Sequence, residues 1–471
     1  MSQEQSTSVL IIGLLSLLAL IPWAAAFLRA RTFRDWDLTA TLVLLVGVLA
    51  NVDAAAYVIG SGRQEQLDPL GRTVIGSPGW VHQIAVVSNG LLLGVCVAFV
   101  LYRLLVVRAR INAAPLIAFT IVLTLGASDG LNGQPVWSPR QLTLLAALLA
   151  AAVGRPGRSA LLGGTAVAMV YTTMGGIQAL MEPADVLRPC RADNACSVLG
   201  IHYAGVFTNE NILGLMLLLC IPFAWLSLRG TVRIVLACYL AFLAAATGSV
   251  LAGTAAVATV VLLAVLRPRL RDEETRGVAR GMPGRSLLAV SVLLPAAVLG
   301  VVVPLRHAMF GDLRLRASIW DMAKEEWADS PLVGYGGKAW SAKYPQGEIP
   351  AAVSPSLHNE WIDVAYAGGL IGAVLLLILL AYLVFRDGTR GIPTIACVLF
   401  PVLLSSVMER PWAFGISNAL TFTLLAATLV PTGTRGSTTT HAPETSVSQG
   451  RVPPAGTRHE TLCFDRSRAR R

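Results

Sequence analysis

The sequence predicts an all-α polytopic membrane protein, and three observations support this fold class. Hydrophobic residues make up 55% of the 471 residues and charged residues 14%, with a mean hydropathy of +0.65. A soluble domain has about 25% charged residues, so a water-soluble enzyme is excluded. The apolar residues gather in runs of roughly 20, the length that crosses a bilayer core as a helix. None of the runs alternates as the strands of a membrane barrel would.

Twelve apolar runs predict membrane-spanning helices. Lipid offers no partner to backbone polar groups, so each run is expected to be helical. A shorter run, 141–153, is the weakest prediction, and we therefore expect 12 or 13 helices. The twelve longer runs cover residues 8–28, 38–60, 83–107, 112–128, 159–180, 209–228, 232–248, 249–266, 286–304, 361–385, 392–408 and 412–430.

The basic residues predict the orientation of these helices. If the N-terminus lies outside and 13 helices alternate in direction, the inside segments hold 25 of the 37 Lys and Arg residues, six of them within 267–285. Cytoplasmic loops are enriched in Lys and Arg. We therefore expect residues 267–285 to face the cytoplasm, and two long loops, 181–208 and 305–360, to face outward.

The ends of the chain predict different behaviour. The first apolar run has no basic residue before it and no obvious small-residue cleavage site after it, so we expect a retained helix rather than a signal peptide. Residues 431–471 are rich in Thr, Pro, Arg and Ser and predict a disordered cytoplasmic tail. Between them we expect N-terminal helices over 1–180 and a second domain over 181–430.

The basic pI does not indicate nucleic-acid binding. The arginines stand in short clusters between apolar runs, not on a basic face interleaved with aromatic residues. Such clusters are typical of the cytoplasmic loops of membrane proteins. We therefore expect membrane lipid, and no nucleic acid, among the partners.

Two cysteines predict a disulfide. Cys190 and Cys196 share the loop 181–208, and the other five cysteines lie in predicted spans or in the tail. Disulfides persist outside the cytoplasm. A zinc site would need more ligands close by, and His202 is the one candidate there. A disulfide is therefore favoured over a metal site or two free thiols.

The loop 305–360 and its end combine cations with tryptophans. Cations bind phosphate, and aromatic faces pack on flat amphipathic surfaces such as sugar rings, so the loop suits a phosphorylated glycan. The alternative, favoured for Trp361, is that the tryptophans mark the bilayer boundary. The residues concerned are Arg306, Arg314, Arg316, Lys324, Lys338, Lys343, Trp320, Trp327, Trp340 and Trp361.

Four segments carry a resemblance to a known family. His358-Asn359 is followed by nine residues and then by Gly369-Leu-Ile-Gly372. Upstream lie Gly205-Val-Phe-Thr-Asn-Glu-Asn211-Ile-Leu-Gly214, then Thr247-Gly248-Ser249, then Arg316-Ala-Ser-Ile-Trp320 followed by Pro331-Leu-Val-Gly334-Tyr-Gly336. This ordered set resembles the motifs of the O-antigen ligase family over roughly residues 200–410. Ala373 stands where the family usually has Gly, Thr or Tyr.

The resemblance implies a glycosyltransferase of C-type membrane architecture that works without metal or cofactor. Such an enzyme moves a glycan from a polyprenyl diphosphate carrier to a hydroxyl of an acceptor glycan or glycolipid at the outer face of the cytoplasmic membrane. Histidine is the usual base near neutral pH, so we expect His358 to be catalytic. The departing diphosphate is a stable anion and needs charge stabilisation more than a proton. No Asp-x-Asp motif occurs in the predicted outside segments to hold a divalent ion.

Two departures from the family affect the predicted diphosphate site. Val250 and His202 stand where family members usually have arginine. Arg316, at the family's R-x-x-x-W position, is the first candidate to replace them, with Arg314 and Lys338 beside it. The alternative is that both arginines pair with Asp312 and Asp321 on the loop surface. These cations, together with His202, Asn211, Ser249 and Asn359, are the expected substrate-binding residues.

Predicted helix starts could also hold an anion. Thr208 or Asn209, Ser249 and Asn359 lie where predicted helices begin. Helix starts carry unpaired N–H groups and the positive end of the dipole. Converging starts would form an anion site. Taken one at a time, ordinary capping is the favoured interpretation of such residues.

Two other functions remain open from the sequence. A repeat-unit polymerase of similar architecture would share the donor chemistry and differ in acceptor. A lipid-linked glycan transporter would predict charges buried in the middle of spans and inverted repeats with broken helices. The predicted spans are almost free of charge at their centres and no repeat is visible, so transport is the least favoured of the three.

Overall fold

The computed structural model is almost entirely helical, which confirms the predicted fold class. It describes residues 3–61, 65–67, 73–75, 78–188, 190, 196–268, 270, 283–306, 313–350, 353 and 356–431. These residues belong to one compact unit. The predicted tail, apart from residue 431, and most of the arginine-rich segment 267–285 lie outside the described residues.

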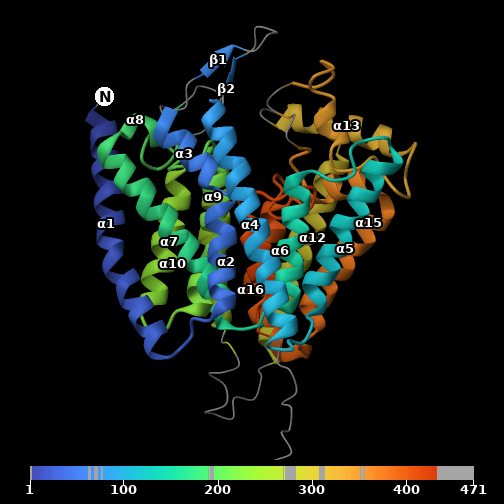
Figure 1. Ribbon diagram of the computed structural model, residues 1–471. Coiled ribbons are helices and arrows are strands. Elements are labelled where there is room, and N and C mark those ends of the chain that lie inside the picture. The colour runs from blue at the N-terminus through green and yellow to red at the C-terminus, as the bar shows by residue number, and fades with distance from the viewer. Residues whose placement is uncertain are drawn as a thin grey trace, which may run out of the picture. The chain divides into compact units, whose positions relative to one another are not determined.

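Helices form over every predicted span (Figure 1). In chain order the elements are α1 (Gln3–Thr32), α2 (Leu38–Leu49), α3 (Val52–Ser61), β1 (Glu65–Leu67), β2 (Thr73–Ile75), α4 (Gly79–Leu105), α5 (Ala113–Leu131), α6 (Pro139–Val153), α7 (Arg158–Met181), α8 (Pro183–Val186), β3 (Leu187–Arg188), β4 (His202–Tyr203), α9 (Glu210–Ser227), α10 (Val232–Ala246), α11 (Val250–Leu266), α12 (Pro283–Val302), η2 (Val303–Leu305), α13 (Leu313–Trp327), α14 (Ala339–Ala342), α15 (Glu360–Phe385), α16 (Gly388–Ser405) and α17 (Thr421–Thr428).

Eight of the described helices are long and apolar enough to cross a membrane. The helices α2 and α3 meet at a bend of 41° and make up to a ninth span if they are counted as one. Three further apolar helices, α6, α10 and α11, are shorter. The chain is therefore a multi-pass membrane protein, and the weakest predicted helix, 141–153, is formed by α6. Its start is fixed by a capping box between Ser138 and Gln141, with Pro139 at the first helical position.

The predicted run 412–430 differs from the other spans. Its first half is irregular, and α17 covers only Thr421–Thr428. The irregular half is fastened by backbone groups: the Trp412 and Ala413 N–H groups donate to Glu360, and the Ser417 N–H donates to the Arg140 carbonyl. Such backbone is tolerated at membrane depth where protein surrounds it and satisfies its polar groups.

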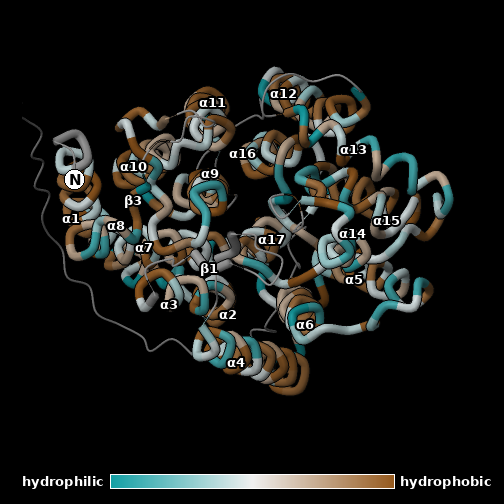
Figure 2. The backbone as a smooth tube through the Cα atoms, turned by 90° about the horizontal axis from the view of Figure 1, so that it is seen from above, coloured by the Kyte–Doolittle hydropathy of each residue, from teal (hydrophilic) through white to brown (hydrophobic). Residues whose placement is uncertain are grey.

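The helix α9 lies inside the bundle, surrounded by other helices, and α4 lies at its edge (Figure 2). In the apolar window of α9, 89% of the residues are buried, against 17% in α4. A helix that is apolar all round needs either protein or lipid on every side. The exposed apolar side chains of α4 therefore suit contact with lipid.

The hydrogen bonds at the two ends of the bundle agree with the predicted alternation of the spans. At one end of the bundle, arginines from predicted inside segments bind residues that lie in, or next to, other predicted inside segments. Arg229 pairs with Asp35 at 3.1 Å, Arg103 donates to the Val153 carbonyl at 2.9 Å, and Arg386 donates to the Thr428 carbonyl at 2.9 Å. The last carbonyls of a helix lack hydrogen-bond partners within the helix. Arg103 supplies such a partner at the end of α6, and Arg386 does so at the end of α17.

The opposite end gathers the predicted outside loops, with α8 and α13 near the top of Figure 1. Asn51 donates to the Ala419 carbonyl at 3.1 Å, and Ser128 donates to the Val333 carbonyl. Cys190 and Cys196 are joined by a disulfide at this end. The short strands β3 and β4 pair antiparallel, with Arg188 opposite His202.

Candidate active site

The candidate site is built around the start of α15. Asn359 is the N-cap of this helix, and its Oδ1 accepts from the Ile362 N–H at 2.9 Å. Its Nδ2 donates to the carbonyls of Gly300 and Val407, each at 2.9 Å. The side chain is fully buried. Asn359 therefore ties α15 to the end of α12 and to the turn after α16, and it fixes the position of the preceding residue.

That preceding residue, His358, has an unusual backbone conformation. Its φ is +50°, in the left-handed region that non-glycine residues rarely adopt. Such conformations persist only where the surrounding structure imposes them, and they cluster at functional sites. Here Asn359 holds the residue that follows, and the Ser356 hydroxyl accepts from the His358 N–H at 3.2 Å.

The imidazole of His358 is oriented by a carboxylate. Its Nδ1 lies 3.3 Å from Oε2 of Glu409, and the His358 side chain is 20% exposed. A carboxylate favours the tautomer with the proton on Nδ1. Nε2 then carries the lone pair, and it has no hydrogen-bond partner among the described residues. This arrangement suits a general base that takes a proton at Nε2.

Glu409 is held from its other side by Arg316. Nη2 of Arg316 lies 3.1 Å from Oε1 of Glu409, and Nη1 donates to the Met408 carbonyl. Burial alone would raise the pKa of Glu409. The hydrogen bond and charge of His358, together with the Arg316 guanidinium, outweigh burial and lower that pKa below its usual range. Glu409 is therefore a stable anion between a histidine and an arginine from two distant segments.

The turn that carries Glu409 is fixed to the first turn of α15. Arg410 pairs with Asp363 at 3.0 Å, and the Leu357 N–H donates to the same carboxylate at 3.4 Å. Glu360 accepts from the backbone N–H of Trp412 at 3.0 Å. These contacts join residues 406–413 to α15, so His358 and Glu409 stay in register.

The tryptophans of the long loop build its core. Trp320 is fully buried and donates to the Leu357 carbonyl at 2.7 Å, and Trp340 donates to the Val353 carbonyl at 3.0 Å. Both pack in one apolar cluster with Tyr366 of α15. These two side chains therefore position the segment that leads to His358, and they are not available to stack on a sugar.

The other predicted cations lie apart from this arrangement. Arg314, two residues before Arg316 on α13, is exposed and has no described ion pair. Lys338 is engaged elsewhere: its Nζ donates to the Pro135 carbonyl, and its N–H donates to Asp129 at 3.1 Å. Arg316 is thus the predicted cation that the described contacts bring to His358.

The second group of motif residues forms a junction of helix starts. Asn209 caps α9 by accepting from the Asn211 N–H at 2.7 Å, and Ser249 caps α11 by accepting from the Ala252 N–H at 3.4 Å. His202 is buried beside Gly248, with Nδ1 3.4 Å from the Thr247 carbonyl. Its Nε2 has no partner among the described residues. No described contact joins this junction to His358.

Arg188 is a cation that the sequence did not single out. It lies opposite His202 in the β3–β4 pair. Its guanidinium lies 3.2 Å from Glu210 and donates to the Thr208 carbonyl at 2.9 Å. A guanidinium therefore stands near the position where the family resemblance led us to expect one. Only the strand pairing brings Arg188 there, 14 residues before His202.

Comparison with known proteins gives one match. Residues 232–377 match the sequence model of a family described as O-Antigen ligase. No curated protein and no solved structure matches the chain. The matched segment runs from α10 into α15 and contains Ser249, Arg316 and His358. It leaves out the junction residues His202 and Asn211 on one side and Glu409 on the other.

The match and the architecture agree on the kind of protein. The predicted resemblance is confirmed over the segment that carries His358, and the chain has the multi-pass helical architecture that it implies. The domain is that of a membrane glycosyltransferase of the O-antigen ligase and polymerase type. Residues 232–377 are therefore similar to the O-antigen ligase family, and the chain carries a domain of this kind.

Proposed function

We propose that this protein is a glycan ligase of the cytoplasmic membrane, with its active site at the outer face. It transfers a glycan from a polyprenyl diphosphate carrier to a hydroxyl of an acceptor glycan or glycolipid. The observation that carries the proposal is the contact of His358 with Glu409, which leaves Nε2 of the imidazole ready to accept a proton.

The proposed step is a displacement at the anomeric carbon of the donor. The acceptor oxygen forms a bond to this carbon while the bond to the diphosphate oxygen breaks. The acceptor proton passes to Nε2 of His358, and polyprenyl diphosphate leaves as an anion. Glu409 stabilises the imidazolium that forms, as a carboxylate does for a protonated histidine. No divalent ion takes part in this proposal.

Arg316 has two proposed roles: it binds Glu409, which orients the base, and it binds the departing diphosphate. A guanidinium has five N–H donors, and two contacts, to Glu409 and to the Met408 carbonyl, leave donors for the diphosphate. Arg188, with its side chain 18% exposed, is a second candidate for that anion. Asn359 positions His358. Ser249 and Asn211 act through the starts of α11 and α9, and His202 of β4 packs beside Gly248. Arg314 and Lys338 have no described contact with His358 or Glu409.

Reconstitution tests the reaction. Purified protein would be given polyprenyl diphosphate glycans and candidate acceptors, and the products separated by mass. A single transfer to an acceptor supports a ligase. A ladder of repeat units would identify a polymerase, and transfer that persists in His358→Ala would remove the proposed base.

Cysteine labelling tests the proposed face. The outer face is supported by the arginines gathered at the opposite end of the bundle and by the disulfide in the loop 181–208. In whole cells, an impermeant thiol reagent should label Pro350→Cys and spare Thr275→Cys, with the unsubstituted chain as the background control. The reverse pattern would put the site in the cytoplasm.

A further inference from the structure

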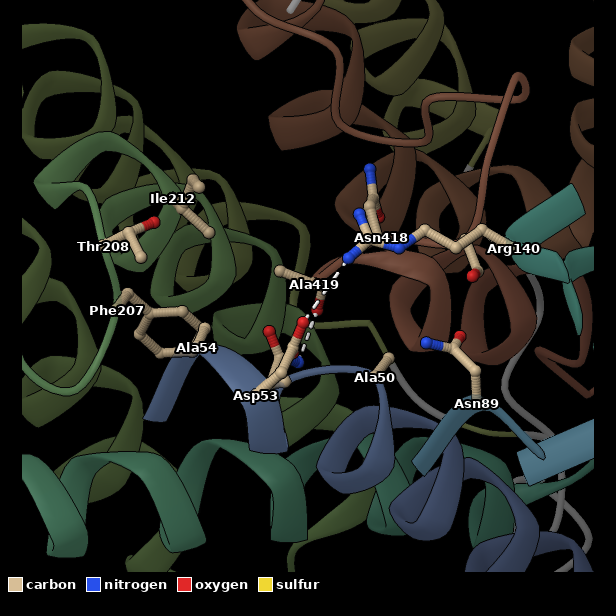
Figure 3. Close-up of a pocket in the computed structure, with 12 residues that line it drawn as sticks. Ala50, Asp53, Ala54, Asn89, Arg140, Phe207, Thr208, Ile212, Asn418 and Ala419 are labelled. Atoms are coloured by element: carbon tan, nitrogen blue, oxygen red, sulfur yellow. Dashed lines mark hydrogen bonds and ion pairs between the residues drawn. The ribbon is translucent and has the colours of Figure 1, made fainter. Parts of the chain in front are cut away.

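A small cavity lined by both polar and apolar residues lies apart from the candidate site, and neither His358 nor Glu409 is part of its lining (Figure 3). Its volume is about 150 Å³. The lining comes from the α2–α3 bend, α3, α4, the start of α6, the approach to α9 and the residues before α17. Arg140 and Asn89 stand on one side, and Thr208 and Ile212 on the other. Five separate parts of the chain therefore converge on one small space.

One polar atom in this lining has no partner. Asn51 is 1% exposed, and its Nδ2 donates to the carbonyls of Gly47 and Ala419. Its Oδ1 is buried and has no hydrogen-bond partner among the described residues. An unsatisfied buried acceptor costs about 1–3 kcal/mol. A donor from a ligand or from water in the cavity would remove this cost.

The charges in the cavity balance. Arg140 and Asp53 face each other at 3.4 Å, so one cation and one anion offset each other. A phosphate would need cations that are not already paired, and an aliphatic chain would leave the polar groups unsatisfied. The lining favours a neutral and polar ligand.

The remaining groups match hydroxyls. The Asn51 amide already donates twice within the chain and offers its Oδ1 as an acceptor. Asn89 donates once to the Ala85 carbonyl and keeps a second N–H and its Oδ1, and the Thr208 hydroxyl can donate and accept. Each sugar hydroxyl also donates once and accepts. Ile212 adds an apolar wall for the CH face of a ring. A cavity of about 150 Å³ is large enough to admit one six-membered ring.

The cavity is connected to the candidate active site by one short segment. Residues 409–419 run from Glu409, beside His358, to Ala419 in the cavity lining. The Ser417 N–H donates to the Arg140 carbonyl at 3.2 Å, which fixes the far end of this segment. A sugar bound in this cavity would belong to the same glycan if that glycan extends along this face from His358.

We propose that this cavity is a subsite for a neutral pyranose ring of the glycan, with Asn51, Asn89 and Thr208 binding its hydroxyls. The proposal rests on the proposed function for the identity of the ligand, and it adds a sugar-binding site away from the reacting bond. Water alone in the cavity is the competing outcome.

Two variants and a matched control test the subsite. Ala54 lines the cavity, so Ala54→Leu should fill it. Ala56→Leu makes the same change on α3 outside the lining and is the control. Thr208→Val keeps the shape and removes one hydroxyl, which should weaken binding about fivefold for one hydrogen bond. If Ala54→Leu does not fold, Thr208→Val alone carries the test.

The measurement is saturation-transfer NMR on the purified full-length protein, in a detergent without a sugar headgroup. Glucose, galactose and N-acetylglucosamine are the probes, with inorganic phosphate in a competition arm. We expect transfer to at least one sugar in the unsubstituted protein, in Ala56→Leu and in His358→Ala, its loss in Ala54→Leu, and no competition by phosphate.

Two results would overturn the subsite. The first is the absence of transfer to all three sugars, which would leave water as the occupant. The second is a signal that persists unchanged in Ala54→Leu and Thr208→Val, or competition by phosphate. Glycan transfer that persists in His358→Ala would overturn the proposed function instead and would leave the sugar-binding result standing.

Discussion

Two regions of this protein carry motifs of the same family, and they differ in their charges. The start of α15 brings together His358, Glu409 and Arg316, with ion pairs across segments far apart in the chain. The junction at the starts of α9 and α11 has caps, a glycine and a buried histidine, and its nearest ion pair is Arg188 with Glu210. We propose that the first region moves a proton and that the second packs helices.

This difference distinguishes two roles that a motif residue can have at a helix start. At α15, the capping residue Asn359 is buried while its neighbour His358 keeps a nitrogen free. At α11, the capping residue Ser249 is followed by exposed Val250, so no charged group extends from that helix start. A motif residue at a helix start can therefore either support catalysis or only cap the helix, and the charges around it distinguish the two roles.

The largest effect is expected for His358→Ala. Without the imidazole the proposed base is missing, so turnover should fall by on the order of 100-fold or more. The measurement is glycan transfer by purified protein. The amount of protein in the membrane should stay unchanged, since the side chain is partly exposed. Near-normal turnover would mean that His358 is not the base. The start of α15 would then not differ in function from the junction at the starts of α9 and α11.

Glu409→Gln should have the next largest effect. The amide keeps the shape and loses the charge that orients His358 and pairs with Arg316. Loss of a hydrogen bond to a charged group costs roughly 1.5–3 kcal/mol, which corresponds to about a tenfold to hundredfold lower kcat. Glu409→Asp, which keeps the charge, should restore part of the rate. Equal rates in both variants would contradict the orienting role.

Glu409→Gln should also change how the stability of the protein depends on pH in acid. Folding lowers the pKa of Glu409, so its contribution to stability is complete above the ordinary pKa of about 4.3. This contribution is lost as the pH falls further through the lowered value. Melting temperatures measured between about pH 6 and pH 3 should therefore fall less steeply in Glu409→Gln than in the unsubstituted protein. Parallel curves would mean that Glu409 is not held by these partners.

Arg316→Lys should cost less, about tenfold in transfer rate. Lysine keeps the charge but cannot bind Glu409 and the Met408 carbonyl with one planar group. Arg314→Lys is the matched control, because Arg314 lies on the same helix and is exposed, and it should behave as the unsubstituted protein does. A donor titration would also reveal whether Arg316 binds diphosphate, since KM for the donor would then rise. Equal loss in both variants would indicate a general effect of charge on the loop.

The spans were predictable because they depend on local composition. Apolar runs of membrane length predicted all the long apolar helices. The basic clusters predicted the alternating direction of the spans, and the hydrogen bonds at the two ends of the bundle agree with it. The bend between α2 and α3 and the short α17 were not predictable in this way. Both depend on contacts with distant segments, such as Asn51 with Ala419.

The candidate site was predictable in part. The motif identified His358, but no local pattern joins it to Glu409, which is 51 residues away and separated from it by α15 and α16. Likewise, Arg316 was expected either to bind phosphate or to pair with Asp312 or Asp321, and it pairs with Glu409. Partners of this kind follow from how helices pack, which local patterns do not record.

The smallest effects on turnover are expected at the junction, and they test the comparison most directly. His202→Phe keeps a ring beside Gly248 and removes the nitrogen that has no partner, so a transfer rate within about twofold of normal follows, with stability changed by about 1 kcal/mol. Ser249→Ala removes the cap of α11 and should lower stability by about 1 kcal/mol with the rate unchanged. Thermal unfolding and transfer assays on the same samples separate these outcomes. If either variant kept its stability and lost its rate, the junction would contact substrate, and the helix starts of α9 and α11 would have to be counted with His358 as part of the active site.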